Sequence, residues 1–344
     1  MALLKVGYPR AVHYYDYFPF WAGFFQGLDL ELIASPLTNR KILEQGLKKA
    51  SDETCLPIKL LAGHIQALSG MGVDALFLPR MVSVEEKTYL CPKLLGLPES
   101  VFAAVPEGMR ILTLDFNVRL GKRRVIRTLE EFAEGLGKTR AEARQGFLLA
   151  QNWQERYESR RHEGRSFGES MGEFDPRLAG EAGRTIRFDN PDRDESAAVL
   201  TVALVGHPYL TQDNYANLNL VAKLGERAHV RFIEEMEPQG IEQGLQGLHK
   251  SVFWSHARKI MGAGAAYIGD EAVDGVIYLS CFGCGTDSMT QDMVARIARQ
   301  QHKPYMVLTL DEHSGEAGLV TRLEAFLDMT ERRVQRESNF SAHG

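Results

Sequence analysis

Short apolar runs alternate with longer amphipathic segments through the first third of the chain. The apolar runs have the length and composition of β-strands, and they cover residues 3–6, 30–33, 73–78 and 111–114. The segments between them have apolar positions at helical spacing, most clearly at 13–27, 42–47 and 57–68. Strands that alternate with helices predict a parallel sheet covered by helices on both faces.

A second series of the same kind begins after residue 197. Its apolar runs cover residues 198–205, 229–233, 273–279 and 305–310, and its helical segments cover residues 213–224, 241–261, 287–299 and 319–329. The chain is also longer than a single hydrophobic core normally grows, which is about 250–300 residues. The pattern therefore predicts two α/β domains, each a doubly wound parallel sheet of the Rossmann or flavodoxin type, facing each other.

Two short motifs recur at nearly the same spacing and indicate an internal repeat. Residues 73–78 and 273–278 both begin with Val-Asp before an apolar run. Residues 7–9 (Gly-Tyr-Pro) end the first strand of one series, as residues 206–208 (Gly-His-Pro) end the first strand of the other. Two copies of one doubly wound unit explain both matches, and chance similarity of short β-runs is the alternative. In such folds, ligands bind outside the carboxyl ends of the strands.

The middle of the chain has a different character. Residues 121–152 are patterned as helices, and residues 154–197 are charged and poor in apolar side chains, which predicts an exposed connector. Residues 135–139 (Gly-Leu-Gly-Lys-Thr) do not complete a phosphate-binding loop, because its first glycine would fall on Phe132 and no strand precedes it. The predicted organisation comprises a first α/β domain at 1–120, a helical segment and charged connector at 121–197, a second α/β domain at 198–335 and a tail at 336–344.

Composition places the chain among ordinary globular proteins. It contains 44% hydrophobic and 25% charged residues, and its formal net charge is −5. A net negative charge argues against nucleic acid or a membrane surface as the partner. No apolar run reaches the roughly 20 residues of a transmembrane helix, and the first residues lack the basic and apolar layout of a signal peptide. We therefore expect a cytoplasmic protein.

The candidate chemistry lies in the 4 cysteines, because in a reducing compartment such residues serve more often as metal ligands or catalytic thiols than as disulfides. Cys281 and Cys284 follow an apolar strand and precede a helix, whose N-terminus would stabilise thiolates. Cys55 and Cys91 lie far away in the sequence, each close to a proline. We expect all of them to meet in space, because Cys91 and the Cys281–Cys284 pair follow equivalent strands of two facing halves.

The residues alone leave four interpretations of these cysteines open. An iron–sulfur cluster takes cysteine thiolates and tolerates scattered ligand positions. Structural zinc also takes four cysteines, although its usual pattern is two Cys-x-x-Cys pairs. A thioredoxin-like dithiol would use Cys281 and Cys284 alone, and buried structural cysteines would need no ligand.

Several polar residues near these positions are weaker candidates for catalysis or ligand contact. They are Glu53 and His64 close to Cys55, His207 at a strand end, and Glu312 and His313, which follow Asp311 in the loop after the strand at 305–310. Lys59 and Lys93 flank cysteines and would offset the negative charge of a thiolate-bound cluster. Each has a structural alternative, which is a local hydrogen bond for the histidines, helix capping for the acids and solvent for the lysines.

Five segments together resemble one protein family. They are 17–25 (YFPFWAGFF), 51–64 (SDETCLPIKLLAGH), 89–98 (YLCPKLLGLP), 281–288 (CFGCGTDS) and 310–326 (LDEHSGEAGLVTRLEAF). These motifs are similar to those of acyl-CoA dehydratase activase-related proteins, which are distant relatives of 2-hydroxyacyl-CoA dehydratase and benzoyl-CoA reductase subunits and of double-cubane cluster proteins. The resemblance extends over most of the chain and is least distinctive at 121–197.

The resemblance implies an iron–sulfur cluster, either [4Fe–4S] or a double-cubane [8Fe–9S] cluster, with Cys55, Cys91, Cys281 and Cys284 as its ligands. It also implies that electrons come from an ATP-hydrolysing activase that carries its own cluster, and it allows a homodimer or pairing with a related subunit. Dehydratases of this kind hold their cluster with three cysteines and leave one iron for the substrate. Four thiolates would instead favour an electron carrier or a reductase component.

Two functions from different classes follow. The first is an iron–sulfur component of an ATP-dependent reductase or dehydratase system, which accepts low-potential electrons for reduction or dehydration chemistry. Because the chain contains no nucleotide-binding motif, hydrolysis of ATP would belong to the partner. The alternative is a two-lobed module that binds a small molecule, with zinc or without a metal.

Overall fold

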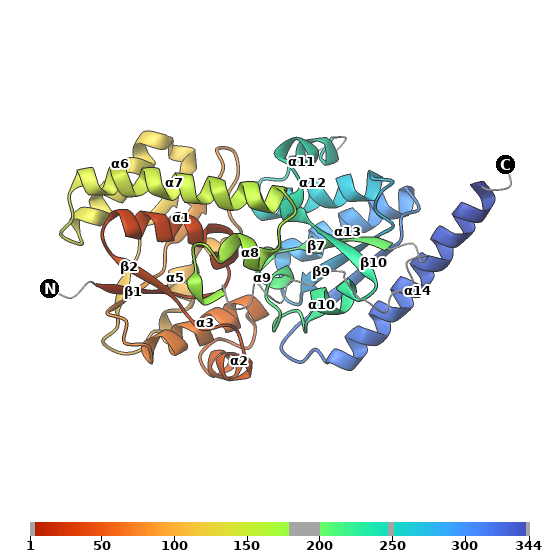
Figure 1. The fold of residues 1–344 in the computed structure, drawn as a ribbon. Helices are drawn as coiled ribbons and strands as arrows, with labels where there is room; N and C mark the ends of the chain where they lie inside the picture. Colours follow the sequence, from red (N-terminus) through yellow and green to blue (C-terminus); the bar gives the residue numbers. More distant parts are fainter. Residues whose placement is uncertain (1–3, 179–199, 247–250, 342–344) are drawn as a thin grey trace. The chain divides into compact units, whose positions relative to one another are not determined.

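The computed structural model describes residues 4–178, 200–246 and 251–341, and these divide into two compact units. The first unit contains 4–178 together with 251–256, and the second contains 200–246 together with 257–341. Each unit is built around its own four-stranded parallel sheet (Figure 1). The α/β class predicted from the alternation of strands and helices is confirmed, with one flavodoxin-like sheet in each unit.

The sheet of the first unit has the strand order β2-β1-β3-β5, and its neighbouring strands all run parallel. Its strands are β1 (Lys5–Tyr8), β2 (Glu31–Ala34), β3 (Ala75–Phe77) and β5 (Arg110–Leu112). A separate parallel pair joins β4 (Arg80–Ser83) to β6 (Asp115–Asn117). The apolar pattern does not predict this pair, because both strands are short and mix polar residues with apolar ones, as in RMVS and DFN.

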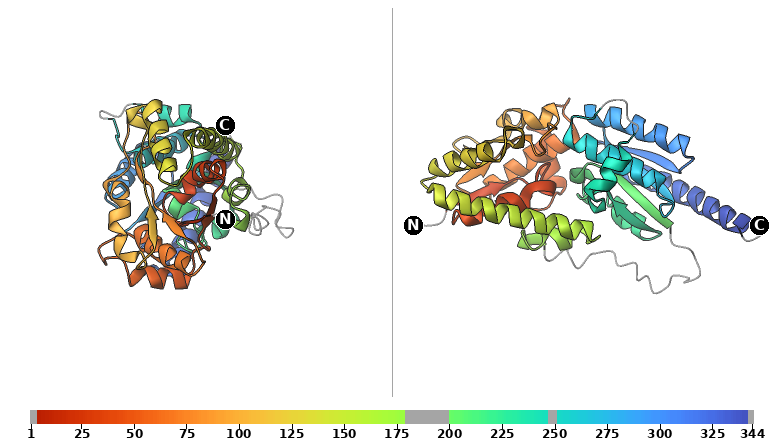
Figure 2. Two further views of the ribbon diagram at one scale, coloured as in Figure 1. Left: turned by 90° about the vertical axis from the view of Figure 1, so that its left-hand side faces the viewer. Right: turned by 90° about the horizontal axis from the view of Figure 1, so that it is seen from above.

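Helices cover both faces of the first sheet, and Figure 2 shows these layers from two further directions. One face carries α1 (Tyr14–Gly27) and α7 (Arg140–His162), and the other carries α2 (Arg40–Leu47) and α3 (Leu56–Ser69). The remaining helices of this unit are α4 (Pro92–Leu95), α5 (Leu97–Ser100), α6 (Lys122–Glu134) and α8 (Phe167–Met171), with 3₁₀ turns η1 (Phe102–Ala104), η2 (Val118–Leu120) and η3 (Pro176–Leu178). The core is aromatic, because α1 packs the rings of Trp21 and Phe25 against Phe77 of β3.

Helix α7 extends into the segment predicted to be an exposed connector. It continues past residue 154 to His162 and buries Tyr157 and Arg161. The hydroxyl of Tyr157 donates a hydrogen bond to the carbonyl oxygen of Tyr15 at 2.8 Å, so the helix is anchored to the start of α1. The sequence does not indicate this contact, because the residues around Tyr157 are charged and predict exposure to solvent. Residues 179–197 of the predicted connector lie outside the described residues.

The sheet of the second unit has the order β10-β9-β7-β8, again with parallel neighbours throughout. Its strands are β7 (Leu200–Gly206), β8 (Ala228–Phe232), β9 (Gly275–Cys281) and β10 (Tyr305–Leu310). Every residue of β9 is buried, as expected for an inner strand of a parallel sheet with both faces covered.

Two pairs of helices cover the faces of the second sheet (Figure 1). On one face lie α12 (Ser255–Gly269) and α13 (Gly285–Gln300), and on the other lie α10 (Leu220–Gly225) and α14 (Glu316–Ser341). The unit also contains α9 (Pro208–Thr211), α11 (Pro238–Gly244) and the 3₁₀ turn η5 (Ile233–Glu235). An ion pair of 2.8 Å between Lys223 and Glu316 joins α10 to α14.

Two predicted helices of this unit are wrong in extent. The helix expected at 241–261 is seen as α11 and α12, and residues 247–250 of the expected range lie outside the described residues. Just before α12, the backbone of Phe253 and Ser255 bonds to Tyr89 at 2.8 and 2.9 Å and leaves helical geometry. The helix expected at 213–224 is confined to α10, because Leu218 and Asn219 have positive φ angles of 56° and 55°. Helix α14 also extends beyond 319–329 and into the predicted tail. Among the described residues, no helix has both the length and the apolar character needed to span a membrane.

The two units repeat one another at the start of the sheet. The carboxylate of Asp74 accepts a hydrogen bond from the backbone N–H of Lys5 at 2.8 Å, and Asp74 returns one to the Lys5 carbonyl at 2.9 Å. Asp274 does the same with Thr201, at 2.7 and 2.8 Å. Each Asp therefore fastens the third strand of a unit to its first. The match between residues 73–78 and 273–278 thus reflects a shared structural device.

Pairs of helices repeat as well. Gly63 of α3 lies so close to the carbonyl oxygen of Ile42 in α2 that a side chain at this position would overlap it. Gly262 of α12 meets the carbonyl oxygen of Ile241 in α11 in the same way. The strand orders also agree when each unit is numbered from its own first strand. The internal repeat is therefore real.

One match used to detect the repeat is shifted, however. Gly7 pairs with Leu76, and the residue that occupies this register in the second unit is Ala203, which pairs with Val276. Gly206 lies further along, because β7 has 7 residues and β1 has 4. The two Gly-x-Pro segments both lie at the end of a strand, but they do not share a register.

Candidate functional site

A cluster of chemically versatile side chains lies at the carboxyl ends of β7 and β9. These strands are neighbours at the point where the strand order of the second unit reverses, since β8 lies on one side of β7 and β9 on the other. His207 follows β7 directly, and Cys281 is the last residue of β9. Such a reversal point is where doubly wound folds bind their ligands.

The loop between β9 and α13 carries two cysteines in a tight turn. Cys281 is buried, Phe282 is exposed, and Cys284 occupies the N-cap position of α13. Gly283 has a φ of 76°, a conformation that glycine adopts without strain, and it allows the backbone N–H of Cys284 to bond to the carbonyl of Cys281 at 3.1 Å. Cys284 therefore stands at a helix start, where backbone N–H groups lack partners within the helix, and the Cys281 thiol donates a hydrogen bond to the carbonyl oxygen of Phe282 at 3.4 Å.

A buried ion pair adjoins this loop. A ring nitrogen of His207 lies 3.3 Å from a carboxylate oxygen of Asp287, which is in the first turn of α13, and the two side chains are 4% and 1% exposed. The Tyr278 hydroxyl bonds to the same carboxylate at 2.9 Å, and the backbone N–H of Cys281 bonds to its other oxygen at 3.2 Å. The His207 ring stacks on Tyr209 with centroids 4.7 Å apart. Both charged groups are thus held in place from several sides.

The two members of this pair change each other's pKa. Burial alone would lower the pKa of His207, but the carboxylate of Asp287 and a smaller contribution from Cys284 outweigh it and raise the pKa well above 6.5. For Asp287, burial favours a higher pKa, but the charge and hydrogen bond of His207 outweigh it and the pKa is lowered. The pair is therefore an imidazolium beside a carboxylate at neutral pH.

His207, Cys284 and Asp287 also form a set of donor atoms suited to a soft or borderline metal. A nitrogen, a sulfur and an oxygen from these side chains lie within 4.8 Å of one another. The Cys284 sulfur lies 3.2 Å from the hydroxyl of Thr286 as well. Among the described residues this is the group with spacing suited to a metal ion, and thiolate and imidazole are ligands of zinc and of iron–sulfur centres.

The two cysteines of the first unit occupy helix starts too. Cys55 is the N-cap of α3, with φ −67° and ψ 153°, and Cys91 is the N-cap of the single-turn helix α4, with φ −65° and ψ 154°. Both are partly exposed, and none of the cysteines forms a disulfide. The helix predicted at 57–68 begins just after Cys55, and the proline that follows Cys91 directly indicates a helix start in the same way. Three of the 4 cysteines are thus N-cap residues.

The polar candidates close to Cys55 lie in contrasting environments. His64 is fully buried, and its two ring nitrogens lie 2.8 Å from the Ser35 hydroxyl and 3.0 Å from the Thr38 hydroxyl. Burial, with a smaller contribution from Arg10, lowers the pKa of His64 to about 3, so this histidine is neutral. Glu53 is exposed. The structure therefore gives His64 a hydrogen-bonding role within the first unit.

The two lysines flanking cysteines differ in the same way. Lys59 is buried, and its ammonium group donates to the carbonyl of Asp52 at 2.9 Å, whereas Lys93 is exposed. The loop after β10 is organised by Asp311, whose carboxylate accepts bonds from the His313 backbone and the Ser314 hydroxyl, both at 2.9 Å. Glu312 lies 3.8 Å from the exposed ring of His313. Asp311 thus organises a turn in the loop before α14, which begins at Glu316, and the helix capping considered for it is not what its carboxylate does here.

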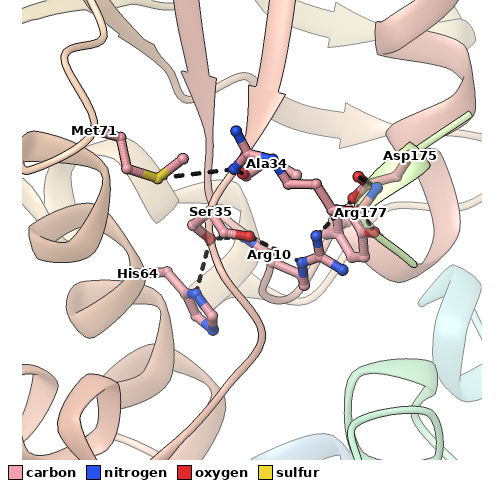
Figure 3. Close-up of polar contacts among 8 residues, drawn as sticks. Arg10, Ala34, Ser35, His64, Met71, Asp175 and Arg177 are labelled. Carbon is pink, nitrogen blue, oxygen red and sulfur yellow. Dashed lines mark hydrogen bonds and ion pairs between the residues drawn. The ribbon is translucent and has the colours of Figure 1, made fainter. Parts of the chain in front are cut away.

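A second buried polar network occupies the carboxyl ends of β1 and β2 in the first unit (Figure 3). Arg10 follows β1 and forms a buried ion pair of 2.8 Å with Asp175, which also accepts a bond of 2.7 Å from Tyr14. The Arg10 backbone N–H bonds to the Ser35 hydroxyl at 2.8 Å, and Ser35 continues to His64. Each partner comes from a different element, so no local pattern in the sequence indicates this network.

Sequence reasoning missed two residues of the second unit that organise the cysteine loop. Asp287 was seen only as part of a helix start, and Tyr278 only as part of an apolar strand. An available signal is the position of Asp287, because an acid in the first turn of a helix reaches back to the backbone before it. Here that backbone group is the N–H of Cys281.

Comparisons with curated proteins and with solved structures do not assign this chain to a family. No curated protein matches it. Among solved structures, the SBP FpvC in complex with Ni²⁺ from P. aeruginosa is 14% identical over 98% of both chains, with a TM-score of 0.25. Similarity at this level has no bearing on the fold or the ligand of this chain.

A family model described as "CoA enzyme activase uncharacterised domain" matches residues 5–236, which is more than half of the chain. The match includes Cys55, Cys91 and His207, and it ends before the loop that carries Cys281 and Cys284. The chain therefore belongs to this CoA enzyme activase family, the activase-related family of the 2-hydroxyacyl-CoA dehydratase system.

Proposed function

We propose that this chain is an iron–sulfur component of a 2-hydroxyacyl-CoA dehydratase-like system. Cys55, Cys91, Cys281 and Cys284 supply its thiolate ligands, most simply for a [4Fe–4S] cluster. An ATP-hydrolysing activase with its own cluster delivers low-potential electrons to it for reduction or dehydration chemistry. Membership of the activase-related family supports a partner in such a system.

The observation that carries this proposal is the placement of the cysteines at helix starts. Cys284, Cys55 and Cys91 are all N-cap residues, and Cys281 lies one tight turn before Cys284. Unpaired backbone N–H groups at a helix start favour negative charge, and cluster-bound thiolates are negative. The donor set therefore fits an iron–sulfur cluster.

An iron–sulfur cluster, when bound, stores and passes single electrons at a potential set by its charge, hydrogen bonds and exposure. The protein's own residues would contribute to this electron transfer in two ways. The N-cap cysteines bind the cluster, and the exposed Phe282, next to Cys281, gives the loop an accessible apolar side chain.

The direct test is to count iron and acid-labile sulfide in protein purified without oxygen. We expect a brown protein with about four irons per chain, as a [4Fe–4S] cluster requires. Replacing any of the four cysteines with Ala should reduce the iron content. Ser288→Ala, an exposed change in the first turn of α13, is the control and should leave the iron content unchanged.

Two outcomes would redirect the proposal. A colourless protein without iron, or full iron content in the cysteine variants, would contradict it. Hydrolysis of ATP by the purified chain alone would assign the activase activity to this chain instead of to its partner.

A second candidate function is a two-lobed binding module with zinc. The observation that favours it is the grouping of His207, Cys284 and Asp287 within 4.8 Å, since zinc takes imidazole, thiolate and carboxylate ligands. Metal analysis separates the two candidates. One zinc per chain that is lost in Cys284→Ala and retained in Cys55→Ala would favour this alternative.

A further inference from the structure

The buried pair of His207 and Asp287 has no role in holding a cluster through four thiolates, yet it lies beside one of them. Taking a histidine ring and a carboxylate out of water costs free energy, so a buried pair of this kind is a poor source of net stability. The pair stands at the carboxyl edge of the sheet, within 4.8 Å of the Cys284 sulfur. Its position therefore needs an explanation beyond packing.

The orientation of His207 is determined by a chain of contacts that starts inside the unit. Thr290 in α13 lies 2.5 Å from the Tyr278 hydroxyl, and that hydroxyl bonds to Asp287. Asp287 in turn holds His207 at 3.3 Å, and the ring of Tyr209 fixes the plane of the imidazole. A residue held so firmly can present a ring N–H to one fixed point.

We propose that His207, oriented by Asp287, donates a hydrogen bond to the sulfur of Cys284 and thereby raises the reduction potential of the bound cluster. This inference rests on the proposed function. Hydrogen bonds to cluster sulfurs stabilise the more negative, reduced state, and they are among the factors that set the potential. The Thr286 hydroxyl, 3.2 Å from the same sulfur, is a second donor of this kind. His207 is thus a positioning residue for electron transfer and not a ligand.

The test compares reduction potentials measured by redox titration with electron paramagnetic resonance detection. The double variant His207→Leu/Asp287→Asn removes both charges together, so that neither is left buried and unpaired. We expect it to keep its iron and to have a more negative potential than the unchanged protein. Asp287→Asn alone should shift the potential in the same direction by a smaller amount. His207→Gln retains a side-chain N–H, so its potential should lie between those of the double variant and the unchanged protein.

The control is His229→Leu, because this histidine is exposed on β8 of the same unit. We expect the reduction potential of the cluster to be unchanged in this variant. An unchanged potential in an iron-loaded double variant would overturn the inference and leave the proposed function intact. Loss of iron from a folded double variant would also overturn it, because His207 would then be a ligand. If the double variant does not fold, the single variants Asp287→Asn and His207→Gln provide the test. An unchanged reduction potential in both, with iron bound, would then overturn the inference. Absence of iron from the unchanged protein would overturn the proposed function and this inference together.

Discussion

The two units share one scaffold and differ at the carboxyl edge of the sheet, which is where doubly wound folds bind their ligands. In both, an Asp fastens the third strand to the first, and two helices meet at a glycine. At the carboxyl edge, the first unit holds a neutral histidine, His64, between two hydroxyl groups, and the second holds a charged one, His207, beside a carboxylate and a thiol. The difference teaches that the repeat determines the scaffold, while side chains from non-equivalent positions, a helix in one unit and a strand end in the other, determine the chemistry at the carboxyl edge.

The largest expected effect comes from breaking the buried ion pair of either unit. Asp175→Ala leaves Arg10 buried without its partner, and Asp287→Ala does the same to His207. We expect each to lower the free energy of unfolding by about 3–5 kcal/mol, measured by urea denaturation. Hydrogen exchange of peptides from β1 and β7 should localise each loss to its own unit.

The matched control for these variants is Asp328→Ala, because Asp328 pairs with Arg227 on the surface. Exposed pairs contribute about 0–1 kcal/mol, so this change should be nearly silent. A loss at Asp175 no greater than at Asp328 would mean that the carboxyl edge of the first unit does not depend on its ion pair.

The glycines between helices test whether the two scaffolds are equivalent. Gly63→Ala and Gly262→Ala would each drive a methyl group into the carbonyl oxygen of the facing helix. Overpacking of this kind costs about 1–3 kcal/mol, and we expect similar losses from the two variants in thermal or urea unfolding. Gly318→Ala is the control, because no atom lies within 4 Å of the added carbon and the position is in α14. A loss confined to one variant would break the equivalence.

Acid should affect the stability of the two units differently, because the folded protein lowers the pKa of His64 and raises the pKa of His207. The folded pKa of His64 is about 3, below the ordinary 6.5, so its contribution is fully present above pH 6.5 and is lost as the pH falls toward 3. The folded pKa of His207 is raised, so its contribution is present below 6.5 and is lost only as the pH rises through the raised value. Between pH 6.5 and 4.5, His64→Gln should flatten the slope of unfolding free energy against pH by about 1.4 kcal/mol per pH unit. Equal slopes with and without His64 would contradict this.

The smallest effect should come from the Asp residues that join the first and third strands. Asp74→Ala and Asp274→Ala each remove one hydrogen bond to a backbone N–H, for a loss of about 1 kcal/mol in urea unfolding. Asp274 should cost more, because its partner Thr201 is half-buried and Lys5 is exposed to water. A larger loss of stability in Asp74→Ala than in Asp274→Ala would show that the two Asp residues do not have equivalent roles.

The sequence predicts the parts of this molecule that depend on local pattern. Alternating strands and helices indicate two parallel sheets, and the Val-Asp motif at 73–78 and 273–278 indicates their repetition. The cysteine loop was placed correctly between a strand and a helix, because the apolar run and the helix start adjoin it, although β9 extends two residues further than predicted and ends at Cys281.

Contacts between distant residues could not be predicted in this way. Arg10 and Asp175 are 165 positions apart, and Asp175 lies in a stretch whose charge resembles that of a solvated connector. The backbone pairing of Tyr89 with residues 253–255 interrupts what is, by local pattern, one long helix. The pair of His207 and Asp287 likewise depends on the neighbouring places of β7 and β9 in the sheet, which local spacing does not encode.

The most direct test of the central claim is electron paramagnetic resonance of the protein purified without oxygen and reduced with dithionite. The account predicts a paramagnetic iron–sulfur signal that is abolished in Cys281→Ala and retained in Ser288→Ala. A silent spectrum from a folded protein that contains zinc, or no metal, would contradict it.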